Sequence, residues 1–338
     1  MTLLAAAVAV AVASASDLQR LGEKLFFDTR LSGDGTVSCA SCHQPDRAFT
    51  DGLRVARGVG RREGTRNTPT LLDVGLQKTF FWDGRRATLE GQAGDPFVNP
   101  NEHGLANHDA LVSRVRADDA YRGPFAAAFG ARDSDIPVTL RRIETALAAY
   151  VRSLAAGETR FDRYAFLREA AALDRREIRG LQLFQGRANC SSCHLITQKS
   201  APLTDGAFHA TLLREDIAAR LDQLTMLIAR AGPEERAQLV SSRADVAELG
   251  RFAVTLDPTD IGKFRTPSLR NVAMTGPYFH DGSVTDLSDA VIREAYARGD
   301  AGTPRLILTP AEVADLVAFL QALTSASQLH AAKQLPVR

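Results

Sequence analysis

Apolar side chains recur every three or four positions over long stretches of the chain, which is the spacing of one buried face of an α-helix. This spacing predicts four helices in particular: 138–154, 175–184, 217–231 and 310–323. Asp174 and Thr309 stand just before two of them and are predicted N-caps. Alternating strand patterns are nearly absent. The sequence therefore predicts a mainly α chain with long ordered loops.

The first fifteen residues have a different character from the rest. Met1–Ala15 is almost wholly small and apolar, and Ala13-Ser14-Ala15 fits an A-x-A cleavage site. This pattern predicts a secretory signal peptide, because the run is short for a membrane span. No Lys or Arg precedes the apolar run, so a short membrane anchor and a buried Ala-rich helix stay open as alternatives.

All the cysteines of the chain lie in two short motifs. These are C-x-x-C-H sequences: Cys39-Ala-Ser-Cys42-His43 and Cys190-Ser-Ser-Cys193-His194. In c-type cytochromes the two thiols of such a motif add across the vinyl groups of one porphyrin, and the His binds its iron. A redox dithiol or a four-Cys metal site explains the paired cysteines but not the His that follows each pair. The sequence therefore predicts two covalently bound haem c groups and a redox function.

Similar residues precede the two motifs. Gly22-Glu-Lys-Leu-Phe26 comes before the first, and Gly180-Leu-Gln-Leu-Phe184 comes before the second. This indicates an internal duplication of a cytochrome-like unit. We expect a signal peptide over 1–15, an N-terminal haem domain over 16–165 and a C-terminal haem domain over 166–338. Each of the two domains would be cytochrome c-like and bind one covalent haem.

The bulk composition adds one exclusion. The chain has 338 residues, of which 45% are hydrophobic and 24% charged, with a formal net charge of +1. This is ordinary for a globular protein long enough for two domains, and nothing in it favours nucleic acid as a partner. Two stretches rich in Gly, Pro, Asn and aromatic residues, 67–104 and 265–283, are long loops of the kind that usually carry function.

Residues in those two loops match the sequence of a known protein family. Together with the haem motifs, the runs Phe80-Phe81-Trp82-Asp83-Gly84-Arg85 and Pro277-Tyr278-Phe279-His280-Asp281-Gly282 resemble the bacterial diheme cytochrome c peroxidase family, which includes MauG. The resemblance covers nearly the whole mature chain, except much of 211–248. It implies that the N-terminal haem, bound by His43, reacts with peroxide. The C-terminal haem, bound by His194, would receive electrons from outside.

The resemblance also implies roles for other residues. Trp82 would lie between the haems and conduct electrons, and His280 would lie near the haem edges, on the electron path or in a supporting hydrogen bond. Gln92 and Glu102 would line the peroxide pocket, with Glu102 as the acid–base group that moves a proton between the peroxide oxygens. The alternatives are an ordinary core Trp and a solvated loop carboxylate.

A calcium ion between the domains is a further implication of the resemblance. Asn67, Thr275 and Pro277 match the family's positions, and amide and carbonyl oxygens are suitable calcium ligands.

The chain departs from the family at both irons. Typical members close the peroxidatic iron with a His on a mobile loop, but no His occurs between Gln44 and Glu102. We therefore expect an iron that is five-coordinate or binds only water. At the other haem, members place a Met or a Tyr fourteen residues after the counterpart of His280. Here that position is Glu294, and Tyr296 follows two residues later. Either a two-residue insertion brings Tyr296 to the iron or another group binds it, and Tyr296 is our predicted ligand.

These features predict a periplasmic diheme cytochrome c peroxidase, an oxidoreductase that reduces hydrogen peroxide to water. Its electrons would come from a small donor protein, a cytochrome c or a cupredoxin, and a homodimer is one arrangement that the resemblance allows. One alternative is a MauG-like enzyme that oxidises residues of a partner protein through a high-valent iron state. Another is a diheme electron carrier without catalysis, although a carrier gains nothing from an open iron.

Overall fold

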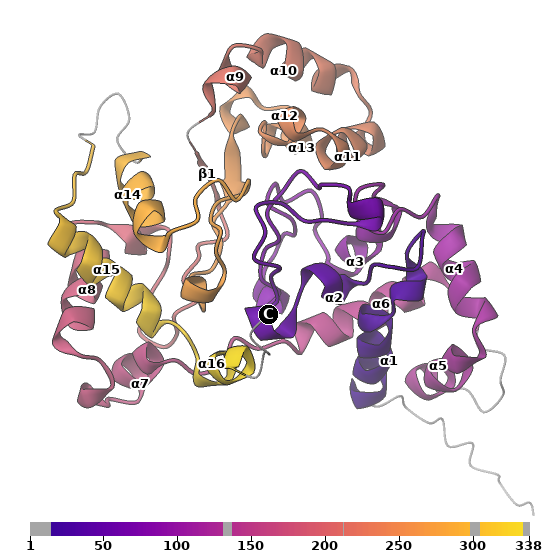
Figure 1. The fold of residues 1–338 in the computed structure, drawn as a ribbon, viewed down its shortest axis with the longest axis horizontal. Coiled ribbons are helices and arrows are strands. Elements are labelled where there is room, and N and C mark those ends of the chain that lie inside the picture. The colour runs from indigo at the N-terminus through magenta and orange to yellow at the C-terminus, as the bar shows by residue number, and fades with distance from the viewer. Residues whose placement is uncertain (1–14, 131–136, 212, 298–304, 334–338) are drawn as a thin grey trace, which may run out of the picture.

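The structure is a computed structural model of the 338-residue chain. It describes residues 15–130, 137–211, 213–297 and 305–333 (Figure 1). The predicted signal peptide, apart from Ala15, lies outside the described residues. Within the described ranges, no helix combines the length and apolar character that crossing a bilayer requires.

Three groups of helices surround a layer of loops in Figure 1. The N-terminal group is α1 (Ala15–Phe27), α2 (Cys39–Cys42), α3 (Leu89–Val98), α4 (His108–Ala117), α5 (Arg122–Phe129) and α6 (Leu140–Arg152). The C-terminal group is α7 (Arg160–Phe166), α8 (Arg175–Gln185), α14 (Leu287–Ala297) and α15 (Pro310–Ala322), and α16 (Ala326–Lys333) lies between this group and the N-terminal one, in contact with the turn at Pro45–Arg47. The third group is α9 (Glu215–Ala218), α10 (Leu221–Arg230), α11 (Pro233–Ser242), α12 (Ala244–Ala247) and α13 (Phe252–Thr255).

Strands are short in the described part of the chain. β1 (Phe208–Ala210) and β2 (Lys263–Arg265) pair antiparallel, with Phe208 opposite Arg265. The expectation of a mainly α chain is therefore confirmed.

The predicted helices are found, with one correction. Three of the four correspond to α6, α8 and α15, and the side chains of Asp174 and Thr309 accept hydrogen bonds from the backbone N–H groups of Glu177 and Glu312. The segment predicted as one helix over 217–231 is instead two, α9 and α10. The break occurs because Arg220, the residue before α10, has a non-helical backbone conformation.

Each helix group has its own buried apolar cluster. The first runs from Leu21 to Ala156 and the second from Phe161 to Leu323, whereas α9 to α13 enclose the third, from Ile217 to Ala253. The first cluster ends at Ala156 and the second begins at Phe161, a few residues before the predicted domain boundary at 165–166. That boundary stays a prediction.

The same helix crossing occurs in both haem-motif units. In the first, α1 packs against α6 so closely that a Cβ on Gly22 would lie 1.9 Å from the backbone oxygen of Ala146. In the second, α8 packs against α15, and a Cβ on Gly180 would lie 2.0 Å from the backbone oxygen of Asp315. These are the glycines that precede the two haem motifs, so the repeat noted in the sequence is also a repeat in packing.

We expect Gly22→Ala to destabilise the protein, because backbone, not a flexible side chain, occupies the space of the new methyl group. Forcing α1 and α6 apart should lower the free energy of unfolding by about 1–3 kcal/mol. Thermal denaturation measures this change. Gly123→Ala in α5 is the matched control, since nothing lies within 4 Å of its added Cβ. A melting temperature for Gly22→Ala at or above that of the parent would contradict the packing argument.

The two loops exchange hydrogen bonds between the halves. The backbone N–H of Asn67 donates to the carbonyl of His280 at 2.8 Å, and the N–H of Arg265 donates to the carbonyl of Trp82 at 2.8 Å. The aromatic runs also have the same shape, since Phe81 and Phe279 both have φ of 67°. Each half therefore holds the aromatic run of the other, which brings Trp82 and His280 between the two halves.

Candidate active site: two cysteine–histidine pockets and the residues between them

The first haem motif forms one wall of a pocket in the N-terminal half. α2 carries both cysteines and ends at His43, whose Nδ1 lies 3.0 Å from the carbonyl oxygen of Phe49. A hydrogen bond from Nδ1–H to this carbonyl leaves Nε2 as the nitrogen that can bind a metal. Burial lowers the pKa of His43, which favours the neutral imidazole that metal binding needs. Cys42 and His43 both line the pocket.

Gln92 and Glu102 line the same pocket, as predicted from the resemblance. Gln92 is on α3, and the loop after α3 carries Glu102, whose Oε1 accepts a hydrogen bond of 2.6 Å from Asn99 Nδ2. The backbone is held too, because the N–H of Val59 donates to the carbonyl of Glu102 at 2.9 Å. Glu102 therefore faces the pocket on a fixed backbone.

The pKa of the Glu102 carboxyl lies near neutral pH. Burial raises the pKa of this carboxyl to about 7, although the nearby positive charge of Arg85 and the hydrogen bond from Asn99 act in the opposite direction. A group with a pKa near the working pH can both accept and return a proton.

His43 is the only His among the described residues that line this pocket. The lining also includes Val240 and Ser241 at the end of α11. Thr65 Oγ1 donates to the carbonyl of Val240 at 2.8 Å, so α11 is joined to the N-terminal loops. The segment 211–248, which the sequence left without a role, thus closes part of the pocket.

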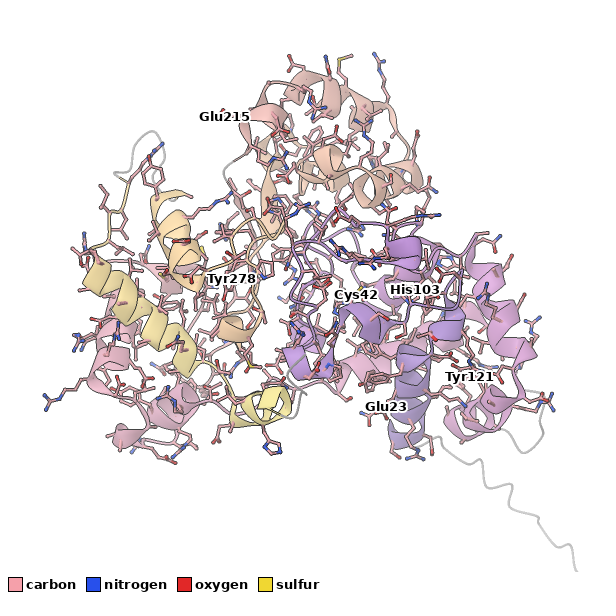
Figure 2. All side chains as sticks on the ribbon, in the orientation of Figure 1. Glu23, Cys42, His103, Tyr121, Glu215 and Tyr278 are labelled. Atoms are coloured by element: carbon pink, nitrogen blue, oxygen red, sulfur yellow. The ribbon has the colours of Figure 1, made fainter. Side chains whose placement is uncertain are left out.

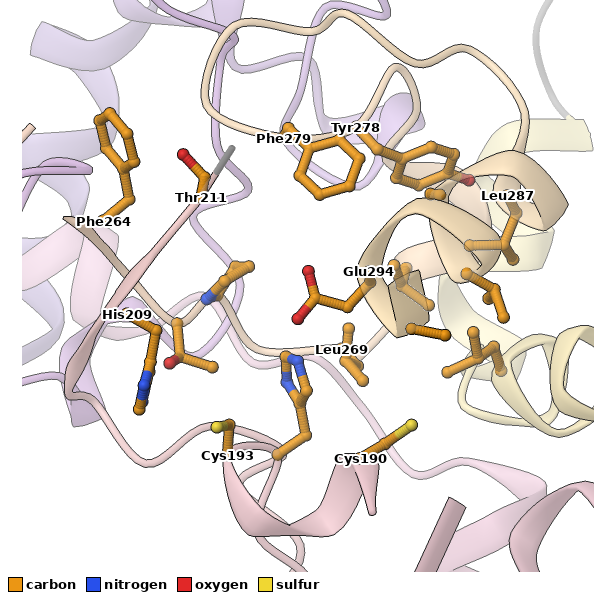
Figure 3. Close-up of a pocket in the computed structure, with 18 of the residues that line it drawn as sticks. Cys190, Cys193, His209, Thr211, Phe264, Leu269, Tyr278, Phe279, Leu287 and Glu294 are labelled. Atoms are coloured by element: carbon orange, nitrogen blue, oxygen red, sulfur yellow. The ribbon is translucent and has the colours of Figure 1, made fainter. Parts of the chain in front are cut away.

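The second haem motif lines a pocket in the C-terminal half (Figure 3). Cys190, Cys193 and His194 form its floor, and His194 Nδ1 lies 2.9 Å from the carbonyl oxygen of Leu203. The arrangement is the same as at His43: a proton on Nδ1 that is donated to the carbonyl leaves Nε2 unprotonated and able to bind a metal. His280 also lines the pocket.

The pockets share Trp82, which lines both of them. Its indole Nε1–H donates to the carbonyl of Asn67 at 3.0 Å, which fixes the plane of the ring. Figure 2 shows Cys42 in the N-terminal half and Tyr278 in the C-terminal half. Trp82 thus lies at both pockets, and its role between two haems stays a prediction.

Two buried arginines support binding of a porphyrin with acidic side chains. No described residue accepts a hydrogen bond from Nε, Nη1 or Nη2 of Arg66, and the carboxylate of Asp83 is 3.8 Å away. Nη1 of Arg265 is likewise without an acceptor among the described residues. Both side chains line the N-terminal pocket, and burial lowers the pKa of each to about 10. Haem propionates are the anions that would pair with such guanidinium groups.

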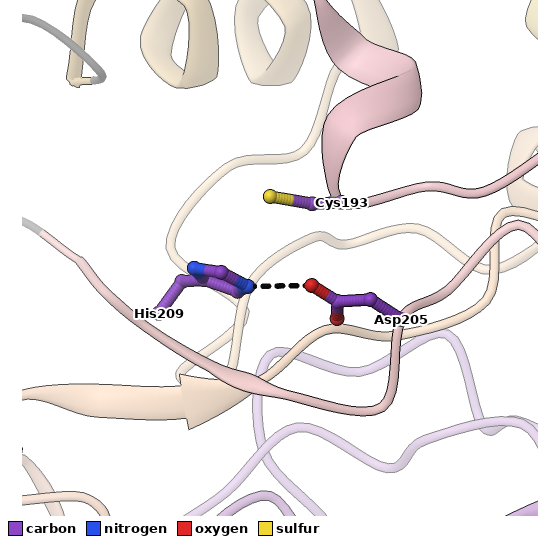
Figure 4. A group of neighbouring side chains, drawn as sticks. All are labelled: Cys193, Asp205 and His209. Atoms are coloured by element: carbon purple, nitrogen blue, oxygen red, sulfur yellow. Dashed lines mark hydrogen bonds and ion pairs between the residues drawn. The ribbon is translucent and has the colours of Figure 1, made fainter.

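The thiols of the first motif are poor candidates for a catalytic nucleophile. Burial raises the pKa of Cys39 and of Cys42 to about 12, with the charge of Glu102 adding to the effect, so neither is a ready thiolate nucleophile. All four cysteines lie in the described part of the chain and none is in a disulfide. Near Cys193, His209 Nε2 is bonded to Asp205 Oδ2 at 2.7 Å (Figure 4), a pair that the sequence analysis did not single out.

His280 has a partner that sequence reasoning missed. Its Nε2 lies 3.1 Å from Glu248 Oε2, and its ring stacks on Phe264 at 3.7 Å between centroids. His280 and Glu248 are only 4% and 5% exposed, so the pair is buried between the halves. No motif marked Glu248, because the contact spans 32 residues and depends on how the third helix group docks.

The remaining predicted residues are not brought together in the same way. Asn67 Nδ2 donates to the carbonyl of Leu53 at 3.0 Å, and Thr275 Oγ1 donates to the carbonyl of Val272 at 3.1 Å. Pro277 follows a cis peptide bond. Among the described residues, no hydrogen bond joins Asn67 to Thr275 or Pro277. The calcium site stays a prediction. Tyr296 is not among the residues that line the C-terminal pocket, and Glu294 is.

Two pockets, each with a Cys-x-x-Cys-His motif and sharing one Trp, define a class of protein: c-type cytochromes with two haem sites in one chain. The family described as di-haem cytochrome c peroxidase matches residues 16–171. The methylamine utilization protein MauG of Methylorubrum extorquens is 36% identical over 94% of this chain and 80% of its own length. The cytochrome-c peroxidase IdrP2 of Denitromonas iodatirespirans is 33% identical over 96% and 86%. The chain belongs to the di-haem cytochrome c peroxidase and MauG family, which implies two haem c cofactors.

Solved structures agree with this assignment. A MauG-like protein associated with microbial copper homeostasis has a TM-score of 0.71 and 34% identity, covering 93% of this chain and 91% of its own. The diheme peroxidase BthA from Burkholderia thailandensis has a TM-score of 0.71 and 27% identity, covering 95% and 88%. Relatives thus carry both peroxidase and MauG names, and the chain is an oxidoreductase of this family.

Proposed function

We propose that the protein is a diheme peroxidase that reduces hydrogen peroxide to water with electrons from a small redox protein. The observation that carries this proposal is the composition of the N-terminal pocket. His43, Gln92 and Glu102 line the same pocket, and no second His lines it among the described residues. Such a pocket leaves one face of a bound haem open to a small substrate.

A bound haem would supply the iron that binds peroxide and would pass on the electrons of the donor protein. The protein supplies the proton transfer. Glu102, with a pKa of about 7, takes the proton from one peroxide oxygen and returns it to the other, which becomes the leaving water. Gln92 offers an amide N–H and a carbonyl oxygen to orient the substrate. Asn99 holds the Glu102 carboxylate in place with its hydrogen bond of 2.6 Å.

Electrons would enter at the C-terminal pocket and cross at Trp82, which lines both pockets. We infer a small donor protein, a cytochrome c or a cupredoxin, because the reaction consumes two electrons and the C-terminal haem site lies apart from the substrate pocket. We also infer a periplasmic location, since haem is attached to such motifs outside the cytoplasm. Calcium at Asn67, Thr275 and Pro277 and a homodimer belong to the same proposal.

Steady-state turnover tests the proposal. The holoenzyme with two haems is mixed with a reduced small cytochrome c, and oxidation of the donor is followed after peroxide is added. We expect oxidation of two donor molecules for each peroxide. Oxidation that is no faster than without the enzyme, with several donors of different potential, would contradict the peroxidase assignment.

A MauG-like activity is the second candidate, favoured by the 36% identity to MauG and the absence of a second His from the described pocket wall. In that case the enzyme would oxidise residues of a partner protein. Peroxide would then produce a covalent change in a partner, detected by mass spectrometry, while turnover with a small donor would be slow. A diheme carrier without catalysis would show neither reaction.

The spin state of the oxidised protein is a separate prediction. Because His43 is the only His in the described lining of the N-terminal pocket, we expect a high-spin ferric haem there before any reduction. Electron paramagnetic resonance of the fully oxidised holoprotein measures this. Two low-spin ferric signals would show that a protein side chain closes the pocket, and the enzyme would then need activation.

A further inference from the structure

α14 presents one continuous face to the C-terminal pocket. Five of its residues line the pocket: Leu287, Ala290, Val291, Glu294 and Ala295. Their spacing of three, four, seven and eight residues from the first is that of one face of a helix. Glu294 is the only charged residue of this set, on an otherwise apolar face.

Tyr296 is on a different side of the same helix. Successive residues of an α-helix are rotated by about 100°, so the side chains of residues two apart point in directions about 160° apart, on nearly opposite sides of the helix. α14 runs unbroken from Leu287 to Ala297, so no extra residues rotate Tyr296 toward the pocket. Its side chain is 43% exposed, and the Arg305 guanidinium lies over its ring at 4.2 Å and donates to its hydroxyl. The structure therefore places Tyr296 away from the pocket that Glu294 lines.

The Glu294 carboxylate points into the pocket (Figure 3), above the turn that carries Cys190 and Cys193. Two of the other polar residues that line the pocket are directed elsewhere. The Tyr278 hydroxyl points toward Leu287, and His209 is bonded to Asp205 at 2.7 Å. Glu294 is thus the one acidic residue of the described lining, and it is placed to face an iron that His194 would bind.

We propose that the Glu294 carboxylate is the protein ligand to the C-terminal haem iron, on the face opposite His194. This rests on the proposed function only in that the C-terminal pocket holds a covalent haem. An anionic oxygen ligand stabilises ferric haem, which carries one more positive charge than ferrous haem, whereas a thioether ligand favours the ferrous state. Glu294 therefore sets a low potential at the electron-entry haem and selects a donor of low potential.

Glu294→Met and Glu294→Gln test this ligand in the holoprotein. We expect Glu294→Met to convert one of the two ferric haem signals into that of a low-spin His–Met haem and to shift the midpoint potential of that haem upward. Glu294→Gln keeps the size of the side chain and removes its charge, so it should also shift that potential upward. The measurements are electron paramagnetic resonance and a spectroelectrochemical titration of both haems.

Two variants of the same helix are matched controls. Asp289→Asn removes a carboxylate from an exposed position of α14 that does not line the pocket, and Tyr296→Phe removes the hydroxyl two residues from Glu294. Both should leave the two ferric signals and both potentials unchanged. A spectral change in Tyr296→Phe, together with an unchanged Glu294→Gln, would overturn the proposal and restore Tyr296 as the ligand.

The outcome is separable from that of the proposed function. A haem content below two per chain, measured on the parent protein, would refute the two-haem function itself. Two haems per chain with wild-type spectra and potentials in both Glu294 variants would refute only the ligand. If Glu294→Met loses haem or fails to fold, Glu294→Gln still decides, because its shape matches the parent residue.

Discussion

Glu102→Gln should lower kcat/KM for peroxide by about 10²- to 10⁴-fold, the range typical of a lost acid–base group. Gln keeps the size of the side chain and can still interact with Asn99, whose Nδ2 bonds the carboxylate at 2.6 Å. It cannot carry a proton from one peroxide oxygen to the other. The N-terminal haem should still bind peroxide analogues, so the loss should fall on the chemical step. Peroxide-dependent oxidation of a reduced cytochrome c measures it.

The pH profile provides a readout that a merely structural role would not change. Proton removal needs the ionised carboxylate, and the pKa of Glu102 is raised to about 7 by burial. The parent kcat/KM should therefore fall about tenfold for each pH unit below that value and level off above it. In Glu102→Gln this limb should vanish.

Glu63→Gln is the matched control for the loss of one carboxylate. Glu63 pairs with Arg57 at 3.3 Å on the surface and does not line the pocket, so its removal should change neither rate nor pH profile. A Glu102→Gln enzyme with parental kcat/KM would show that another group moves the proton.

Local patterns explain what the sequence could predict. Each Cys-x-x-Cys-His motif places its ligands within five residues, so the two haem sites were visible without any tertiary information. Helix periodicity and caps located α6, α8 and α15 for the same reason. Trp82, Gln92 and Glu102 came from resemblance, and the structure brings all three to the wall of one pocket.

Contacts between distant segments explain what the sequence could not predict. Glu248 reaches His280 only because the third helix group docks on the loops, and no spacing rule describes that docking. Arg66 is an ordinary loop arginine in the sequence, but in the structure it is buried without a hydrogen-bond acceptor among the described residues. At α14 the sequence placed the proposed ligand of the C-terminal haem to within two residues. The sequence could not show the phase of this helix, which places Glu294 and not Tyr296 on the pocket side.

Trp82→Phe should slow electron transfer between the two haem sites and leave peroxide binding intact. The indole lines both pockets and is fixed by its hydrogen bond of 3.0 Å to the Asn67 carbonyl, so it offers a short aromatic path between them. Phe is smaller and harder to oxidise. We expect steady-state turnover with a reduced cytochrome c to fall by about tenfold or more, equivalent to a barrier higher by about 1.4 kcal/mol.

Stopped-flow spectroscopy separates this step from the others. The fully reduced holoprotein is mixed with peroxide, and reoxidation of the C-terminal haem is followed at its own wavelength. In Trp82→Phe this phase should slow while the absorbance change of the N-terminal haem keeps its rate. Phe279→Leu is the control, since Phe279 lines only the C-terminal of the two pockets. If Phe279→Leu slowed reoxidation and Trp82→Phe did not, electrons would cross along the C-terminal aromatic run, through the stacked His280 and Phe264 rings.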